Sequence, residues 1–224
     1  MNMKPGETAI GFIGIGVMGK SMAEHIRQAG YELHVYTRTA AKADELVHRG
    51  AVWHETPADL AAACDAIITM VGYPKDVEEL YLGERGLIAR AKAGAYLIDM
   101  TTSSPILAKR IHEAAARKGL YALDAPVSGG DIGARERRLS IMVGGDQEAF
   151  DAALPLLQRM RSGTAYEDVQ PDRHRFEYAR RLRSDRLCRS GGAGPEHRAR
   201  QHRIRRRGQL VAQQSGTAHH RRQL

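Results

Sequence analysis

The sequence predicts an α/β protein whose mostly parallel β-sheet is covered by helices on both faces. Short apolar runs alternate with amphipathic segments through the first 160 residues, as in successive βαβ units. The first apolar run, residues 9–13, leads into the glycine-rich turn G-I-G-V-M-G at 14–19, and an amphipathic segment follows at 21–29. Strand, glycine turn and helix in this order are typical of a Rossmann-like, doubly wound fold.

The remaining elements follow from the same alternation. Further strands are expected at residues 33–37, 51–53, 66–71, 95–100, 120–124 and 139–143. Helices are expected at residues 40–48, 59–63, 76–82, 104–118 and 147–160. Ligands of such folds bind beyond the carboxyl ends of the strands, and the distinctive small and polar residues of this sequence gather there. They are residues 14–19, 37–38, 72–74, 101–102 and 125–130.

The three glycines of the first turn suit a phosphate site. Gly14 permits a tight turn, Gly16 lets the backbone approach a ligand, and Gly19 lets the new helix pack closely on the strand. The helix N-terminus then directs its N–H groups and dipole at an anion. We predict that this turn binds the pyrophosphate of a dinucleotide through Gly14, Ile15, Gly16, Val17, Met18 and Gly19. The alternative is a turn that joins strand to helix and binds nothing.

The end of the second predicted strand bears on the choice of cofactor. An acidic residue about 20 positions beyond the glycines holds the ribose 2′-hydroxyl of NAD, whereas an arginine suits the 2′-phosphate of NADP. Here the strand ends Y-T-R-T, without a carboxylate, and Thr37 and Arg38 are the candidate contacts. This favours NADP. In the alternative, Arg38 is a solvated residue at the start of a helix, and NAD binds through backbone groups and threonine hydroxyls.

A second informative stretch is D-A-P-V-S-G-G at residues 124–130. A Ser-Gly-Gly turn after a strand presents a hydroxyl and consecutive N–H groups, which together can bind a carboxylate. Ser128, Gly129 and Gly130 are therefore candidate substrate contacts, and a plain loop is the alternative.

Four stretches together resemble one enzyme family. They are G-F-I-G-I-G-V-M-G (11–19), D-M-T-T-S-S-P (99–105), D-A-P-V-S-G-G (124–130) and L-S-I-M-V-G-G (139–145). Their order and spacing, over about residues 8–160, resemble the β-hydroxyacid dehydrogenases, which include 3-hydroxyisobutyrate dehydrogenase and tartronate semialdehyde reductase. The resemblance implies hydride transfer between NAD or NADP and a small 3-hydroxyacid or its semialdehyde, by a homo-oligomer that assembles through a second, helical domain.

The resemblance also assigns roles to single residues. Thr102 is expected near the nicotinamide, and Ser128, Gly129 and Gly130 around the substrate carboxylate. Much of the family has a Leu-Pro pair after the fourth strand, where this chain has Val71 followed by Gly72. Val71 is nevertheless a candidate cofactor contact.

Composition divides the 224-residue chain in two. Residues 161–224 contain 16 arginines, no lysine and six acidic residues, a net charge of +10, whereas the first 160 residues carry −2. The basic segment has no nucleic-acid motif and few aromatic residues, so only non-specific binding of nucleic acid is expected. A signal peptide and a membrane span are not expected, and Cys64 and Cys188 match no metal or redox spacing. A cytoplasmic protein without a metal site is therefore predicted.

The C-terminal segment departs from the family pattern. We predict a dinucleotide-binding domain at 1–160 and, at 161–224, an irregular or disordered tail in place of the family's helical domain. The family's catalytic lysine belongs to that domain, but no lysine follows Lys118, so no catalytic residue is predicted. With permissible codons, residues 163–184 read from the second nucleotide give G-Q-H-T-K-M-S-N-Q and onward, and residues 206–219 also give a family-like stretch in this frame. The hypothesis is a frameshift near Met160, with weak or no dehydrogenase activity as its consequence.

Overall fold

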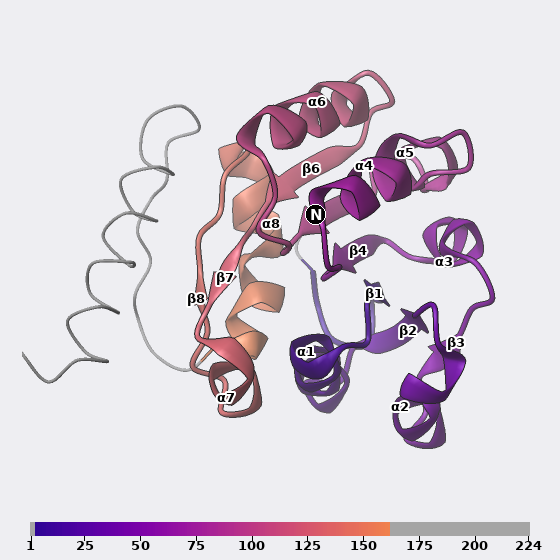
Figure 1. The fold of residues 1–224 in the computed structure, drawn as a ribbon, viewed down its shortest axis with the longest axis vertical. Coiled ribbons are helices and arrows are strands. Elements are labelled where there is room, and N and C mark those ends of the chain that lie inside the picture. The colour runs from indigo at the N-terminus through magenta and orange to yellow at the C-terminus, as the bar shows by residue number, and fades with distance from the viewer. Residues whose placement is uncertain (1–2, 162–224) are drawn as a thin grey trace, which may run out of the picture. The chain divides into compact units, whose positions relative to one another are not determined.

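The computed structural model of the chain describes residues 3–161, which contain a six-stranded parallel sheet with helices on both faces (Figure 1). The strands of this sheet are β1 (Ala9–Ile13), β2 (Glu32–Tyr36), β3 (Val52–Trp53), β4 (Ala66–Thr69), β5 (Tyr96–Asp99) and β6 (Tyr121–Asp124). Their order in the sheet is β3-β2-β1-β4-β5-β6. The chain starts in the middle at β1, runs outward to the edge strand β3, and then returns to β4 and runs to the other edge at β6. The order therefore reverses between β1 and β4, where doubly wound folds bind their ligands. The predicted fold class is confirmed.

The helices begin at residues whose chemistry suits a helix start. They are α1 (Val17–Gln28), α2 (Asp44–His48), α3 (Pro57–Ala63), α4 (Pro74–Leu82), α5 (Leu87–Arg90), α6 (Pro105–Ala116), α7 (Gly130–Arg135) and α8 (Gln147–Leu157). Single 3-10 turns occupy Ala40–Lys42 and Gln158–Met160. Proline stands at the start of α3, α4 and α6, where its missing N–H costs no helical hydrogen bond. Because of these prolines, α3 and α4 begin two residues earlier than predicted.

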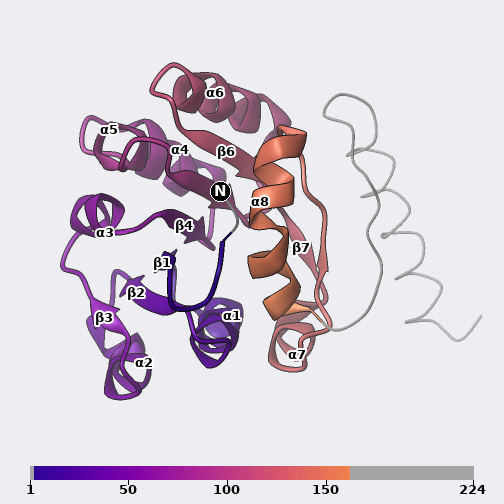
Figure 2. The ribbon, with the colours of Figure 1, turned by 180° about the vertical axis from the view of Figure 1, so that it is seen from behind.

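Side chains that alternate along the strands supply two cores. On one face Phe12 and Ile68 pack with α1, α2 and α8. Helix α8 lies in front in Figure 2, which shows the molecule from behind. On the other face Ile67 and Leu97 pack with α3, α4, α5 and α6. Each fully buried aliphatic side chain contributes about 1.5–3 kcal/mol of hydrophobic free energy. The parallel sheet is thus buried on both sides, which explains the near-continuous apolar runs of its strands.

The segment after β6 differs from the prediction. The run at 139–143 was expected as one more strand, but only β8 (Ser140–Ile141) forms, and it pairs antiparallel with β7 (Val127–Ser128) outside the main sheet. The expected Ser-Gly-Gly turn is also shorter than predicted, because α7 begins at Gly130. Helix α5 is an element that the sequence pattern did not indicate.

Within residues 3–161 no helix has the length and apolar character needed to cross a membrane. The same residues contain no group of three or more His, Cys, Asp or Glu side chains placed to hold a metal ion. The predictions for the tail from residue 162 onward, including the frameshift and its irregular structure, lie outside the described residues.

Candidate functional site

The three glycines of the turn between β1 and α1 differ in what a Cβ would meet at each position. Gly14 has φ +103°, and a Cβ there would overlap the carbonyl oxygen of Met70 at the end of β4. A Cβ on Gly19 would overlap the carbonyl oxygen of Gly14, because α1 starts so close to the turn. A Cβ on Gly16 would meet nothing within 4 Å. Gly14 and Gly19 are therefore fixed by packing, whereas Gly16 keeps a space open in front of the helix.

The N-terminus of α1 faces this open space. Gly16 is the exposed N-cap residue, and the 12-residue helix has no acidic residue in its first turn. The first N–H groups of a helix have no partner within the helix, and its dipole places partial positive charge there. Of the residues between the glycines, Ile15 is buried while the Val17 side chain is 78% exposed. The backbone of this turn, more than its side chains, is suited to bind an anion.

A cavity of about 790 Å³ opens beside the turn, at the carboxyl ends of β1, β2 and β4. It brings together five of the predicted contacts, namely Gly14, Gly16, Thr37, Arg38 and Val71. Other wall residues belong to positions that the sequence did not single out, namely Lys42, Asp76, Glu79, Leu80 and residues 83–86. The volume falls within the range typical of small-molecule and cofactor sites.

The charges around this cavity are mixed. Arg38, Lys42 and Arg85 contribute positive charge, and Asp76, Glu79 and Glu84 contribute negative charge. Arg38 lies across from α4, and its Nη1 is 3.7 Å from Asp76 Oδ1. Lys42 and Arg85 reach the wall only through the tertiary structure. No local sequence signal therefore identifies them as cavity residues.

A buried hydrogen-bond network closes the ends of β4 and β5. The Asp99 carboxylate accepts hydrogen bonds from the Thr69 hydroxyl at 2.9 Å, the Thr101 N–H at 3.0 Å and the Ser103 hydroxyl at 3.4 Å. The Thr69 hydroxyl also bonds the buried Tyr81 hydroxyl, at 2.8 Å. The Thr101 hydroxyl in turn accepts from the N–H of Val71, at 3.1 Å. The network thus fixes the two loops that carry Val71 and Thr102.

Burial governs the electrostatics of this network. It raises the pKa of Asp99, although the hydrogen bonds from Thr101, Thr69 and Ser103 act in the opposite direction. It also raises the pKa of Tyr81 well above its ordinary value, so this hydroxyl stays protonated. Thr102 itself is exposed at the mouth of the loop. The network therefore holds the backbone of the loop and leaves the Thr102 side chain accessible.

The predicted substrate contacts lie in a different part of the carboxyl edge. Ser128 ends β7 and pairs with Ser140 of β8, and Gly129 and Gly130 have φ +137° and +66° as the chain enters α7. Neither these three residues nor Thr102 line the cavity beside the glycine turn. Of the six predicted phosphate contacts, Gly14 and Gly16 line the cavity together with Thr37, Arg38 and Val71. The other four (Ile15, Val17, Met18 and Gly19) and the predicted nicotinamide and substrate contacts lie outside its lining.

Comparison with known proteins identifies the family. A protein-family model described as the NAD binding domain of 6-phosphogluconate dehydrogenase matches residues 9–167. The chain belongs to this family. The matched residues, which include the glycine turn and most of the described structure, are thus an NAD(P)-binding domain.

Relatives within this family are oxidoreductases by name. The uncharacterized oxidoreductase YkwC of Bacillus subtilis is 60% identical over 158 residues, which are 70% of this chain and 55% of that protein. The 3-hydroxyisobutyrate dehydrogenase of Pseudomonas aeruginosa is 41% identical over 153 residues, 68% of this chain and 51% of that protein. The solved structure of Mycobacterium tuberculosis 3-hydroxyisobutyrate dehydrogenase with L-serine has a TM-score of 0.65 at 31% identity, covering 71% of this chain and 53% of that chain. The chain spans about half the length of these relatives.

Proposed function

We propose that residues 1–160 are the dinucleotide-binding domain of a 3-hydroxyacid dehydrogenase, with the pyrophosphate held at the N-terminus of α1. The observation that carries this proposal is Gly16, whose missing Cβ keeps open the space that the first N–H groups of α1 face. Gly14 and Gly19 maintain the turn around it. The cavity beside it has room for the adenosine half of the cofactor.

The remaining predicted residues receive roles in the same proposal. Thr102 lies near the nicotinamide, in a loop that Asp99 holds in place. Ser128, Gly129 and Gly130 bind the carboxylate of a small hydroxyacid. A bound dinucleotide supplies or accepts the hydride, and the protein orients the substrate beside it.

The wall of the cavity favours NADP over NAD. Arg38 and Lys42 both line it near the end of β2, and neither of the residues that end this strand, Tyr36 and Thr37, is acidic. Two cations at this position suit a 2′-phosphate. The alternative remains NAD bound through backbone groups and threonine hydroxyls, with Arg38 solvated.

We further propose that this chain binds the dinucleotide but turns over hydroxyacids weakly or not at all. Hydride transfer to or from the substrate carbon needs a proton donor or acceptor at the substrate oxygen, and a lysine serves this purpose in the family that the sequence resembles. No lysine follows Lys118, and arginine does not readily release its proton. The frameshift near Met160 would account for this loss. The corresponding second candidate function is a non-catalytic dinucleotide-binding module in the cytoplasm.

The test compares cofactor binding with turnover in the full chain. NADPH and NADH are titrated by their own fluorescence, and Gly16→Val is the variant that fills the proposed phosphate space. Because a Cβ there meets no atom within 4 Å and φ is −88°, the variant should fold normally and lose most of its affinity for both nucleotides. Unchanged affinity would contradict the phosphate site. Turnover of a short 3-hydroxyacid at about 1 s⁻¹ or more would contradict the loss of activity and support an intact dehydrogenase.

A further inference from the structure

The carboxylate of Asp76 lies within ion-pair distance of the arginine that faces the cavity. Asp76 is near the start of α4, and its Oδ1 lies 3.7 Å from Nη1 of Arg38, which follows β2. The distance exceeds that of a hydrogen bond, and the Arg38 side chain is 78% exposed. Exposed pairs of this kind are weak, because water and salt screen the attraction between their charges. Arg38 therefore remains available to a stronger anion that enters the cavity.

The position of Asp76 itself is more constrained. Its side chain is 30% exposed, and its second oxygen, Oδ2, is buried and has no hydrogen-bond partner among residues 3–161. A partly buried carboxylate with few donors depends on nearby positive charge. Within this described part of the chain, Arg38 is the cation that pairs with it. Asp76 thus holds a negative charge close to the guanidinium that a 2′-phosphate would use.

We propose that Asp76 is a specificity-determining residue that limits the preference for NADP(H). Its charge competes with the 2′-phosphate for Arg38 and also repels that phosphate directly. NAD(H) carries an uncharged hydroxyl at the same position, so its affinity responds little to Asp76. The inference rests on the proposed binding of a dinucleotide in this cavity and adds that its walls contain opposing determinants, with Arg38 and Lys42 on one side and Asp76 on the other.

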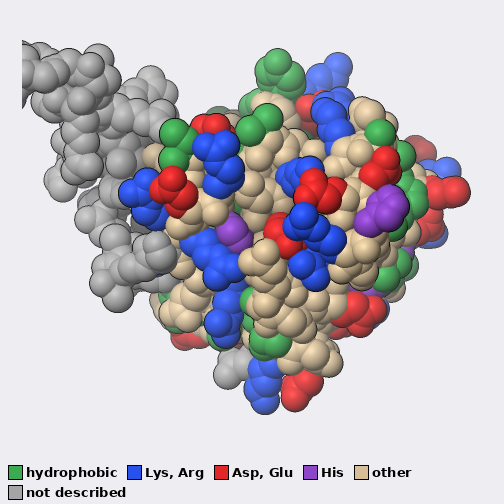
Figure 3. All heavy atoms as spheres, turned by 90° about the horizontal axis from the view of Figure 1, so that it is seen from below, with side chains coloured by type: hydrophobic (Ala, Val, Ile, Leu, Met, Phe, Trp, Pro, Cys, Tyr) green, Lys and Arg blue, Asp and Glu red, His purple; other side chains and the backbone are tan. Residues whose placement is uncertain are grey.

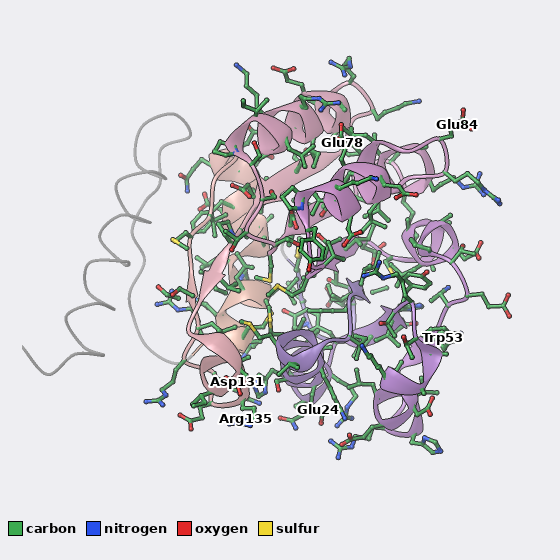
Figure 4. All side chains as sticks on the ribbon, in the orientation of Figure 1. Glu24, Trp53, Glu78, Glu84, Asp131 and Arg135 are labelled. Carbon is green, nitrogen blue, oxygen red and sulfur yellow. The ribbon has the colours of Figure 1, made fainter. Side chains whose placement is uncertain are left out.

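The chain offers a matched control for the charge. Glu84 also lines the cavity and is exposed. Figure 4 shows its side chain at the outer side of the segment between α4 and α5. Among the described residues it makes no ion pair with Arg38, which pairs with Asp76. Glu84→Gln therefore removes one negative charge from the same wall without releasing the guanidinium.

The experiment uses the full chain and four variants, Asp76→Asn, Glu84→Gln, Arg38→Gln and the double variant of Arg38 and Asp76. NADPH and NADH are titrated by fluorescence at low and at physiological ionic strength. Asp76→Asn should lower the Kd for NADPH roughly threefold to tenfold at low ionic strength, and change the Kd for NADH less than about twofold. This gain in NADPH affinity should be smaller when Asp76→Asn is combined with Arg38→Gln, and smaller at higher salt. Glu84→Gln alone should raise the affinity for NADPH less than Asp76→Asn does.

Several outcomes would overturn the inference. They are an unchanged Kd for NADPH in Asp76→Asn, equal changes for the two nucleotides, or an equal gain in Glu84→Gln. Circular dichroism and thermal unfolding of each variant separate loss of fold from loss of affinity. If the parent chain bound neither nucleotide, the proposed function would itself be wrong, which differs clearly from binding with an unaltered NADPH-to-NADH ratio.

Discussion

The two halves of the sheet's carboxyl edge are built differently. At the ends of β1, β2 and β4 the backbone leaves a cavity of about 790 Å³ beside the first turn of α1. At the end of β5 the buried Asp99 network closes the strand ends, and Thr102 is presented to solvent beyond it. Beyond β6 the chain forms the short β7–β8 pair and α7. The first half thus has a cavity of ligand size, whereas the second half has loops that the network positions outside that cavity.

The largest effect is expected at Gly14, where the first half depends on packing. Gly14→Ala combines a left-handed backbone conformation, φ +103°, with overlap of the Met70 carbonyl oxygen. We expect a loss of about 3 kcal/mol or more in the free energy of unfolding by urea. Gly16→Ala is the matched control and should cost about 1 kcal/mol or less, because its Cβ meets nothing within 4 Å. Similar losses in the two variants would mean that the glycines do not have separate roles.

The sequence predicts the first half better than the second, for physical reasons. Residues 9–13 and the turn at 14–19 are specified locally, by apolar side chains and by Gly14 and Gly19, which each satisfy a steric requirement. Lys42, Asp76 and Arg85 reach the cavity only because the sheet brings the starts of α2 and α4 and the loop before α5 together. Such long-range neighbours leave no periodic or spacing signal in a single sequence.

The second half was harder to predict because its local signals conflict. The apolar run at 139–143 reads as a strand, yet it lies outside the parallel sheet and pairs over only two residues, Ser140 and Ile141. Ser128, Gly129 and Gly130 read as a turn, although Gly130 already belongs to α7. Positive φ at both glycines serves the sharp entry into that helix. The Ser-Gly-Gly pattern therefore predicts the position of a turn but does not predict that α7 begins within it.

The net charge of the whole chain does not describe the charge of its folded domain. The net charge of +8 belongs to residues 161–224, because the first 160 residues carry −2. On the face shown in Figure 3, basic and acidic side chains are interspersed. Glu24 illustrates this, since hydrogen bonds from Arg27, Gln28 and Arg49 outweigh the effect of burial and lower its pKa to about 2. The described domain thus balances its charges by local pairs.

A smaller effect is expected at Asp99, which organises the second half. Asp99→Ala leaves the Thr101 N–H and the Thr69 hydroxyl without their acceptor and should cost about 2–3 kcal/mol in urea unfolding. Asp99→Asn retains an acceptor and should cost less. If the network only positions the second half, Asp99→Asn should leave the Kd for NADPH nearly unchanged. A large loss of NADPH affinity with intact stability would place Asp99 in the cofactor site itself.

The pH dependence of Asp99→Asn has a defined sign. Burial raises the folded-state pKa of Asp99, so the folded protein binds this proton more tightly than the unfolded chain does. The stability contributed by the proton is complete below the unfolded pKa, about 4, and is lost as pH rises through the folded pKa. Relative to the parent, Asp99→Asn should therefore gain stability as pH rises through this interval. A stability difference that is constant with pH would contradict the assignment of the raised pKa to Asp99.

The smallest effect on stability is expected at the junction between α7 and α1. His25 on α1 lies with Nε2 2.8 Å from the Ala134 carbonyl oxygen, and Arg137 Nε donates to its Nδ1 at 3.0 Å. A carbonyl oxygen only accepts, so Nε2 carries the proton and Nδ1 is the acceptor. In Figure 4, Glu24 of α1 and Arg135 of α7 mark the same junction, and both line a second hollow of about 250 Å³. His25 therefore joins α7 to α1 through its two ring nitrogens.

His25→Ala should cost about 1 kcal/mol in urea unfolding, since it removes two hydrogen bonds at a partly solvated junction. His48→Ala is the matched control, because His48 is exposed and, among residues 3–161, its hydrogen bond is to the Asp44 carbonyl oxygen of its own helix. Hydrogen exchange of the amides at 129–137 should accelerate in His25→Ala while the Kd for NADPH stays unchanged. This combination would show that α7 and the Ser128–Gly130 segment are held by α1 independently of the cavity. Equal exchange rates in both variants would show instead that α7 is fixed by the packing of Ala134 alone, which is buried against α1.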